Sequence, residues 1–257
     1  MEAPFVMAIC PTFNRPACIA NVLAMWGQQT YQNSNLLIYD DANQYVPQAD
    51  ESHIVVSAEK RHPTLGGKFA TAIELGIKRA RLMGVDLNSL CFALFEDDDV
   101  YFPHYIESHA RTLAHASWSS PRRLLANDGV GKGKWHTTDG LRRHHGAWAF
   151  SLNAYLISGG YRAEESWGFD MQFGARLASS VGEPVATDAA GKGPICLYRW
   201  MTASKNGSGM GELSMMNSQP PHEGPKIRVP DPEFDAETAD YYSEFGNIVL
   251  PSTCCGG

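Results

Sequence analysis

Short apolar runs alternate with amphipathic stretches through the first 118 residues of the chain. The apolar runs have the length of buried strands, and several of them end in turn residues or acids. The stretches between them repeat apolar residues at helical spacing. We expect strands at 5–10, 35–42, 53–58 and 89–95, and helices at 17–29, 65–84 and 103–116. This order of elements predicts an α/β fold with a mainly parallel sheet.

The second half of the chain is less regular. Residues 119–148 are polar and predict a region rich in loops, whereas 147–161 predict a strand, a short helix and a Gly-Gly turn. A further helix is expected within 165–182, and a last strand at 194–200. Gly, Ser, Met and Pro dominate from residue 201 onward, which favours a mobile flap or tail over 201–257.

The composition is that of an ordinary globular protein, with 44% hydrophobic and 11% aromatic residues among 257. This length predicts one domain with at most one appendage. The net charge of −7 argues against a dedicated non-specific nucleic-acid binder. No apolar run reaches the ~20 residues of a membrane helix, and the start lacks a signal-peptide pattern. The six cysteines include no Cys-x-x-Cys pair, so we expect a reducing, cytoplasmic setting.

Acidic residues follow two of the expected strands. They are Asp40 and Asp41 after the second strand, and Glu96, Asp97, Asp98 and Asp99 after the fourth. Parallel strands end at a common edge, where open α/β sheets bind ligands. Adjacent carboxylates repel one another unless a cation or hydrogen bonds offset the charge, and Mg²⁺ or Mn²⁺ with a phosphate-bearing substrate would do so. The alternative is a solvated acidic loop that caps the next helix, and this stretch alone does not decide between them.

Six segments, taken in order, resemble the family-2-type glycosyltransferases, whose nucleotide-sugar-binding fold is called GT-A. They are CPTFNRPACIANVLAMWGQQTY, LLIYDDA, LGGKFATAIELG, FEDDDVYFPHYI, GAWAFSLNAYLISGGY and GFDMQFGARL. The resemblance covers residues 4–200 and implies a Rossmann-like, mainly parallel sheet flanked by helices. It implies transfer of a sugar from a nucleoside diphosphate donor, commonly UDP, to an acceptor hydroxyl, usually with Mn²⁺ or Mg²⁺.

The resemblance also implies a division of the chain. The GT-A catalytic domain would cover 1–200, with a nucleotide-sugar-binding half over 1–118 and an acceptor-binding half over 119–200. Residues 201–257 would form a flexible C-terminal extension.

On the donor side, the resemblance assigns individual roles. The nucleotide-sugar site would comprise Pro11, Thr12, Asn14, Arg15, Asp40, Lys68, Asp97, Asp98 and Trp167. Asp40 would accept a hydrogen bond from the uracil ring, with Asp41 as a competing candidate and a turn aspartate as the alternative. Lys68 would approach the diphosphate, or else be a surface lysine. Trp167 would stack on a sugar face, or else pack against the protein.

The metal site rests on the match of residues 97–99 to the Asp-x-Asp motif. Asp99 is expected to be the direct metal ligand, and Asp97 would reach the ribose or the metal. Glu96 is interpreted as the last residue of the strand and not as a ligand. Many relatives carry a further histidine ligand shortly after the last strand, where this chain has none. His222 is the nearest candidate, and a tail histidine without a special role is the alternative.

The catalytic base is expected at Asp170, which matches the acid that opens the helix after the Gly-Gly turn in inverting members of the family. An inverting transfer needs one carboxylate to take the proton of the acceptor while a metal stabilises the departing diphosphate. Capping of the helix start is the alternative role for Asp170.

Between residues 122 and 145 lie six Lys or Arg residues against two Asp. In the family this region faces the acceptor, so the charge suggests an acceptor that carries phosphate. The expected acceptor-binding residues are Trp135, Arg142, Arg143, His144, His145 and Trp148. One candidate acceptor is a hydroxymethylated pyrimidine in DNA, as in some phage-type glycosyltransferases that resemble the family. The others are a saccharide, free or lipid-linked, and a protein side chain, and a solvated loop is the alternative for the run itself.

Rival functions fit the residues less well. A nucleotidyltransferase that makes sugar nucleotides would need a Gly-rich phosphate loop after the first strand, and CPTFNRPA has no such run of glycines. A phosphatase of the Asp-x-Asp kind would place its nucleophile where this chain has Pro11 and Thr12. A non-catalytic module that binds nucleotide sugars stays as an alternative, although the acids at 97–99 and 170 argue against it.

Overall fold

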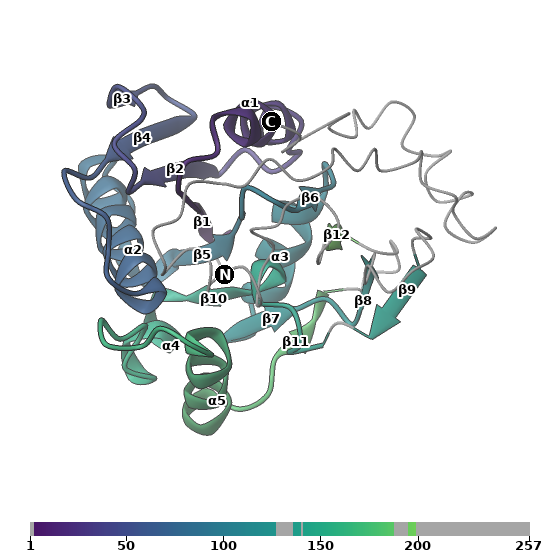
Figure 1. Ribbon diagram of the computed structural model, residues 1–257. Helices are drawn as coiled ribbons and strands as arrows, with labels where there is room; N and C mark the ends of the chain where they lie inside the picture. The colour runs from purple at the N-terminus through teal and green to yellow at the C-terminus, as the bar shows by residue number, and fades with distance from the viewer. Residues whose placement is uncertain (1–2, 127–135, 140, 188–194, 199–257) are drawn as a thin grey trace.

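The computed structural model describes residues 3–126, 136–139, 141–187 and 195–198 (Figure 1). Within these residues the main sheet has eight strands, in the order β11-β7-β10-β5-β1-β2-β4-β3. In that order the strands span Val185–Ala186, Trp118–Ser120, Ala149–Ser151, Leu90–Leu94, Phe5–Thr12, Ser34–Asp40, His53–Ser57 and Gln48–Ala49. The central strands β5, β1, β2 and β4 run parallel, whereas β10 and β3 run antiparallel to their neighbours. The expected α/β fold with a mainly parallel sheet is confirmed.

Helices cover both faces of the main sheet, as Figure 1 shows. One face carries α1 (Pro16–Trp26) and α3 (Tyr105–Leu113). The other carries α2 (Leu65–Leu82), α4 (Leu152–Ile157) and α5 (Phe169–Val181). Two short 3-10 helices, η1 (Leu87–Ser89) and η2 (His145–Ala147), precede β5 and β10. The sheet is therefore the middle layer of three.

Strand β1 shows that the sheet is buried on both faces. All eight of its residues are buried. Val6, Ala8 and Cys10 belong to the core on the side of α1 and α3, whereas Met7 and Ile9 belong to the core on the side of α2. Successive side chains of a strand point to opposite faces, so a strand covered by helices on both faces needs a continuous apolar run. The run FVMAIC meets that need.

A second sheet of four strands lies beside the first, in the order β6-β12-β8-β9. Its strands are Val100–Tyr101, Cys196–Tyr198, Arg123–Ala126 and His136–Asp139. Strands β7, β8 and β9 occupy part of the region expected to be rich in loops over 119–148, whereas β12 lies within the last strand expected at 194–200. These strands are two to four residues long, and β12 pairs with β6 and β8, which are far away in the sequence, whereas β8 pairs with the nearby β9. Segments as short as β6, β8 and β9 carry too little periodicity to be predicted locally.

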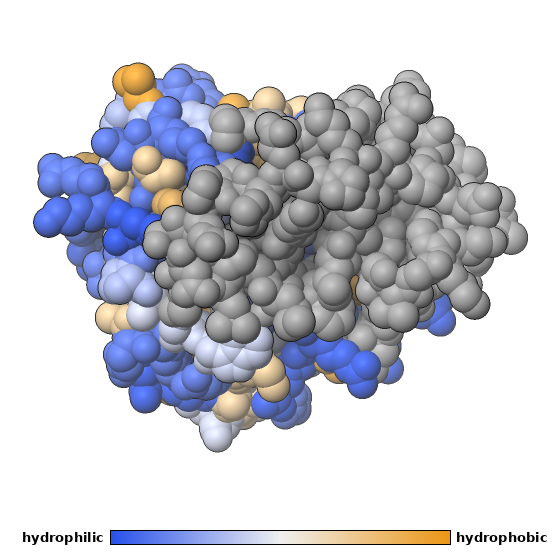
Figure 2. Space-filling model, in the orientation of Figure 1, coloured by the Kyte–Doolittle hydropathy of each residue, from blue (hydrophilic) through white to orange (hydrophobic). Residues whose placement is uncertain are grey.

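The surface of the described part is mostly hydrophilic on the face shown in Figure 2, with apolar residues scattered over it. Among the described helices, none combines the length and the apolar character needed to cross a membrane. The tail expected over 201–257 lies outside the described residues.

Candidate active site at the carboxyl edge of the sheet

Buried carboxylates gather where β1, β2 and β5 end. Thr12, the last residue of β1, pairs with Asp40, the last residue of β2. Asp40, Asp41, Asp97 and Asp99 are each no more than 5% exposed. A buried charge is costly unless it is paired or hydrogen-bonded. The partners of each carboxylate therefore indicate its role.

The acids after β5 divide into two sets. Carboxylate oxygens of Glu96, Asp98 and Asp99 lie within 4.8 Å of one another, and Asp97 lies outside this group. The interpretation of Glu96 as the last strand residue was wrong, because β5 ends at Leu94. Beyond the strand end the strict alternation of side chains no longer applies, and the chain brings Glu96 to the same side as Asp98 and Asp99.

The backbone of Glu96 is held by a tyrosine hydroxyl. Its N–H donates a hydrogen bond to the Tyr101 hydroxyl at 2.8 Å, and that hydroxyl donates to the Gly146 carbonyl oxygen at 2.9 Å. The Tyr105 hydroxyl donates to the Leu94 carbonyl at 2.8 Å and lies 3.2 Å from the same Gly146 oxygen. Two buried tyrosines on β6 and α3 thus hold Gly146 against the turn that carries the acids.

Gly146 lies close beside two of the three carboxylates, those of Asp99 and Glu96. A Cβ atom at this position would lie 2.8 Å from Asp99 Oδ2 and 3.1 Å from Glu96 Oε2, so a larger residue would displace them. Burial raises the pKa of Glu96, the neighbouring charges of Asp98 and Asp97 add to the shift, and a hydrogen bond with His145 opposes it. A divalent cation would offset this repulsion, and Mg²⁺ and Mn²⁺ prefer carboxylate oxygens. The three residues therefore fit a divalent cation.

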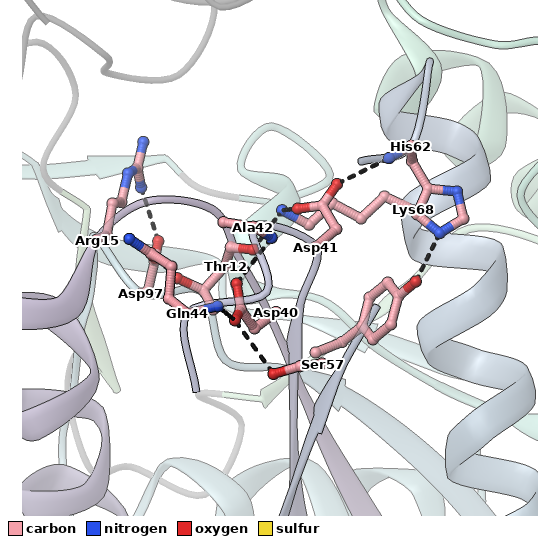
Figure 3. Close-up of polar contacts among 11 residues, drawn as sticks. Thr12, Arg15, Asp40, Asp41, Ala42, Gln44, Ser57, His62, Lys68 and Asp97 are labelled. Carbon is pink, nitrogen blue, oxygen red and sulfur yellow. Dashed lines mark hydrogen bonds and ion pairs between the residues drawn. The ribbon is translucent and has the colours of Figure 1, made fainter. Parts of the chain in front are cut away.

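Asp97 is held on the side of β1. Its Oδ2 accepts a hydrogen bond from the Thr12 hydroxyl at 2.6 Å, and its Oδ1 accepts one from Arg15 at 2.7 Å (Figure 3). The same Arg15 nitrogen lies 3.0 Å from Asp98 Oδ2. Burial lowers the pKa of Arg15, but the charges of Asp97 and Asp98 outweigh burial and raise that pKa above its ordinary value. Each Asp97 oxygen thus has a protein partner, and Asp97 lies outside the group of Glu96, Asp98 and Asp99, so its expected contact with the ribose or the metal stays a prediction.

Asp40 binds the loop that follows it. Its carboxylate accepts hydrogen bonds from the backbone N–H groups of Ala42 at 2.9 Å and Tyr45 at 3.2 Å, and from the Ser57 hydroxyl at 3.2 Å. Figure 3 shows the Asp40 carboxylate turned toward this loop. Asp40 is fully buried, so its oxygens serve the protein itself. This corrects the expected contact with uracil and supports the alternative of a turn aspartate.

Lys68 reaches from α2 to the ends of β1 and β2. Its Nζ lies 2.8 Å from Asp41 Oδ1 and donates a hydrogen bond to the Thr12 carbonyl at 2.9 Å (Figure 3). The other Asp41 oxygen accepts a hydrogen bond from the His62 N–H at 3.1 Å. Lys68 is only 6% exposed, so the surface-lysine alternative was wrong. These contacts use two of the three N–H donors of the ammonium group, and the expected contact with a diphosphate stays a prediction.

The loop after β1 is the exposed part of the expected nucleotide pocket. Pro11 is buried, whereas Asn14 is exposed and has a left-handed φ of 53°. The Asn14 side-chain oxygen accepts a hydrogen bond from Gln44 at 2.8 Å, which joins the loops after β1 and β2. The Arg61 guanidinium lies 4.1 Å from the centre of the Phe13 ring, a cation–π contact at the same edge.

Asp170 lies in the first turn of α5 and is half-buried. The helix begins after Gly168, whose φ of 64° suits glycine, and no side chain caps it. Capping is therefore not what Asp170 does. Burial raises the pKa of the Tyr161 hydroxyl, and the charges of Glu96 and Asp170 both add to the shift. Asp170 and Glu96 therefore both lie near enough to the Tyr161 hydroxyl to influence it electrostatically.

Helix α5 is anchored to the Gly-Gly turn. Arg176 donates to both carboxylate oxygens of Glu165 and to the Gly160 carbonyl at 2.7 Å. Paired guanidinium and carboxylate groups of this kind fix orientation as well as distance. Trp167, just before the helix, is 63% exposed, so the packing alternative for this residue was wrong.

The expected acceptor-binding residues fall into three sets. Arg142 and Arg143 are exposed, and Arg142 pairs with Glu183 at 2.9 Å. His145 and Trp148 are buried, and His144 is half-buried. Trp148 packs edge-on against Trp118 and lies over Gly174, so it has no face for an acceptor, which corrects the expectation. Trp135 and His222 lie outside the described residues.

Sequence reasoning missed Glu96, Gly146 and Tyr161. Only Glu96 had a signal, because it stands two residues before Asp98 and so has the spacing of an acid-x-acid pair. Gly146 approaches Glu96, and Tyr161 hydrogen-bonds His145, only because the fold brings these distant segments together.

No protein-family model matches the sequence, and no curated protein matches it. Solved structures do match. The chain is similar to S. aureus TarS 1-349, with 12% identity, a TM-score of 0.54 and coverage of 75% of this chain and 59% of that one. The complex of the same protein with UDP-GlcNAc matches at 12% identity and a TM-score of 0.53, over 84% and 61% of the two chains.

The complex of TarS with UDP matches at a TM-score of 0.53 and 12% identity, over 82% of this chain and 62% of that one. The chain thus spans less than two thirds of the length of these structures. Identity at this level shows the fold and not the activity. With its mainly parallel sheet and helices on both faces, the chain has the GT-A fold of the nucleotide-sugar glycosyltransferases.

Proposed function

We propose that the chain is a metal-dependent glycosyltransferase that moves a sugar from a UDP-sugar to an acceptor hydroxyl. The observation that carries this proposal is the group formed by Glu96, Asp98 and Asp99 at the carboxyl edge of a GT-A sheet. Ligands of open α/β sheets bind at that edge. The complexes of TarS with UDP-GlcNAc and UDP support a uridine diphosphate donor.

The donor would lie along the ends of β1 and β5. Thr12 and Arg15 border the acids there, and Arg15 bridges Asp97 and Asp98. In this arrangement the guanidinium supplies positive charge beside the place of the diphosphate. Asp97 keeps unused acceptor capacity for a ribose hydroxyl, because each carboxylate oxygen has two lone pairs.

Asp170 would act as the base of an inverting transfer. It would take the proton of the acceptor hydroxyl while the oxygen attacks the anomeric carbon. The bond from that carbon to the diphosphate oxygen breaks on the opposite side, so the configuration inverts. A bound Mg²⁺ or Mn²⁺ would offset the charge that develops on the diphosphate. Arg176 and Glu165 would keep α5, and with it Asp170, in place.

The acceptor we propose is a hydroxymethylated pyrimidine in DNA. Arg122, Arg123, Arg142 and Arg143 are exposed in a chain of net charge −7, and phosphate contacts of DNA-binding proteins come largely from such side chains. The base would have to leave the duplex to reach Asp170.

A saccharide is the second candidate acceptor, and Trp167 is the observation that favours it. Its indole is 63% exposed and stands three residues before Asp170. Exposed aromatic rings offer an apolar face to the C–H side of a sugar.

A donor panel tests the transferase proposal. The protein is incubated with Mn²⁺ and each nucleotide sugar, and release of nucleoside diphosphate is measured with and without EDTA. We expect metal-dependent release from a UDP-sugar. Absence of release from every donor, with retained UDP binding, would favour the non-catalytic module instead.

The variant Asp170→Asn tests the proposed base. We expect it to lower turnover by about 10²–10⁴-fold, the usual contribution of a general base, and to keep UDP binding. Glu164→Gln, which removes an exposed acid six residues earlier, is the matched control and should keep full turnover. Unchanged turnover in Asp170→Asn would remove Asp170 from the mechanism.

Duplex oligonucleotides test the DNA acceptor. At low salt we expect binding that weakens when Arg142 and Arg143 are both replaced by Glu. Undetectable binding, or binding indifferent to that double change, would leave the saccharide as the acceptor class. Trp167→Ala should then raise the KM for a saccharide acceptor.

A further inference from the structure

A buried hydrogen-bonded chain runs from Glu96 through His145 to Tyr161. His145 Nδ1 lies 2.9 Å from Glu96 Oε1, and His145 Nε2 lies 2.7 Å from the Tyr161 hydroxyl oxygen. His145 is 7% exposed and Tyr161 is 5% exposed. The three residues come from the turn after β5, from η2 and from the segment between α4 and α5, so only the fold joins them.

The chemistry of the three groups fixes the direction of this chain. A carboxylate has no hydrogen to donate, so Nδ1 carries the hydrogen that Glu96 accepts. In the neutral ring, Nε2 is then the acceptor, and the Tyr161 hydroxyl donates to it. Tyr161 therefore selects the tautomer of His145 that Glu96 needs.

The imidazole has little freedom to turn. The rings of Phe69, Trp148 and Phe169 surround it edge-on, with ring centres 4.9, 5.3 and 5.1 Å from the imidazole centre. Close-packed side chains of this kind restrict a ring to one orientation. The donor nitrogen of His145 is thus aimed at Glu96 before any ligand binds.

This arrangement leaves the two oxygens of Glu96 with different surroundings. Oε1 is bound to His145, whereas Oε2 faces the space beside Gly146, which Asp99 Oδ2 also borders. The carboxylate is thereby turned so that one oxygen is available next to Asp98 and Asp99. Asp97 is instead held on the side of β1, where its two oxygens bind Thr12 and Arg15.

We propose that His145 and Tyr161 are positioning residues that hold Glu96 as a ligand of a divalent cation shared with Asp98 and Asp99. This inference rests on the proposed function in one respect: the cation is the same one that would bind the diphosphate of the sugar donor. It replaces the expected acceptor contact of His145, which the burial of the ring does not permit. Partners that orient a metal ligand typically change metal affinity by about 10–100-fold when they are removed.

Binding of Mn²⁺ alone, measured by calorimetry and by the loss of the free-ion EPR signal, tests the proposal without any sugar donor. We expect His145→Leu to weaken Mn²⁺ binding by about 10–100-fold. His145→Asn should restore much of the affinity, since its amide can donate to Glu96 from near the position of Nδ1. Tyr161→Phe, which keeps the packed ring and removes only the hydroxyl, should weaken binding in the same direction but less.

The control is His109→Gln, which changes another buried imidazole whose Nδ1 lies 2.8 Å from the Ser119 hydroxyl instead of a carboxylate. It should leave Mn²⁺ binding unchanged. Equal affinity in wild type, His145→Leu and Tyr161→Phe would overturn the inference, as would a loss of the same size in His109→Gln or no binding by wild type. Weakened Mn²⁺ binding in the two variants, together with no donor turnover by wild type, would uphold the inference and overturn the transferase.

Discussion

At the scale of single residues, Gly146 lies against the proposed cation site. Its carbonyl accepts a hydrogen bond from Tyr101, and its missing side chain lets the backbone lie close to Asp99 and Glu96. The glycine is needed here for close approach and not for a left-handed backbone, because it is not among the positive-φ residues.

We predict that Gly146→Ala weakens Mn²⁺ binding by about 10-fold or more, an effect of the size seen when partners of metal ligands are removed. The added methyl group would lie 2.8 Å from Asp99 Oδ2 and force the carboxylates apart. Titration calorimetry with Mn²⁺ measures the effect. Gly27→Ala is the control, because a Cβ there meets nothing closer than 3.5 Å. Equal affinity in Gly146→Ala would mean that the carboxylates adapt.

At the scale of elements, the start of α2 ties the donor side of the site to the side of the proposed base. The Thr64 hydroxyl accepts the N–H of Gly67 at 3.1 Å and so caps the helix. The N–H of Gly66 donates to the Glu165 carbonyl at 2.9 Å. Glu165 is in turn bound by Arg176 of α5. One turn beyond the cap, Lys68 reaches Asp41, so this helix end supports both halves of the site.

We predict that Gly66→Ala lowers the free energy of unfolding by about 1–3 kcal/mol, as expected for overpacking. A Cβ there would lie 2.3 Å from the Arg162 carbonyl oxygen and 2.6 Å from that of Glu165. The direction of the change in unfolding free energy separates the two effects, because alanine stabilises most exposed helix positions by up to about 1 kcal/mol relative to glycine. Urea unfolding gives the value. Thr71→Ala in the same helix is the control, and a stabilised Gly66→Ala variant would mean that the 162–165 segment moves away freely.

At the scale of the whole molecule, His109 couples stability to pH. It lies in α3, is fully buried, and hydrogen-bonds Ser119 of β7 through Nδ1. Burial lowers its pKa to about 3. An unfolded histidine titrates near pH 6.5. Below that pH the unfolded chain therefore binds a proton that the folded chain does not.

The sign follows from this difference. The contribution of neutral His109 to stability is complete above about pH 6.5 and is lost progressively as the pH falls toward 3, at up to about 1.4 kcal/mol per pH unit. We predict that the unfolding free energy of His109→Gln depends less on pH between 6.5 and 4 than that of wild type. Urea unfolding at several pH values measures it. His115→Gln, at an exposed histidine, should follow wild type, and parallel curves for all three proteins would contradict the prediction.

The sequence by itself determined the fold class and the edge at which the acids gather. The run FVMAIC is continuous because β1 is buried on both faces, and parallel strands must end at one edge. These features are local, and the order of strands and helices follows from them. The six segments of the GT-A resemblance pointed to the same fold, which the comparison with TarS supports.

The tertiary structure alone decided which acid serves which purpose. Asp40, Asp97 and Glu96 are all carboxylates beside a strand end, and their local sequence does not tell which groups each one binds. In the fold, Asp40 hydrogen-bonds its own loop, Asp97 hydrogen-bonds Thr12 and Arg15, and Glu96 hydrogen-bonds His145. The physical reason is that hydrogen bonds and desolvation act between groups that are distant in sequence, so they are settled only when the strands and helices pack.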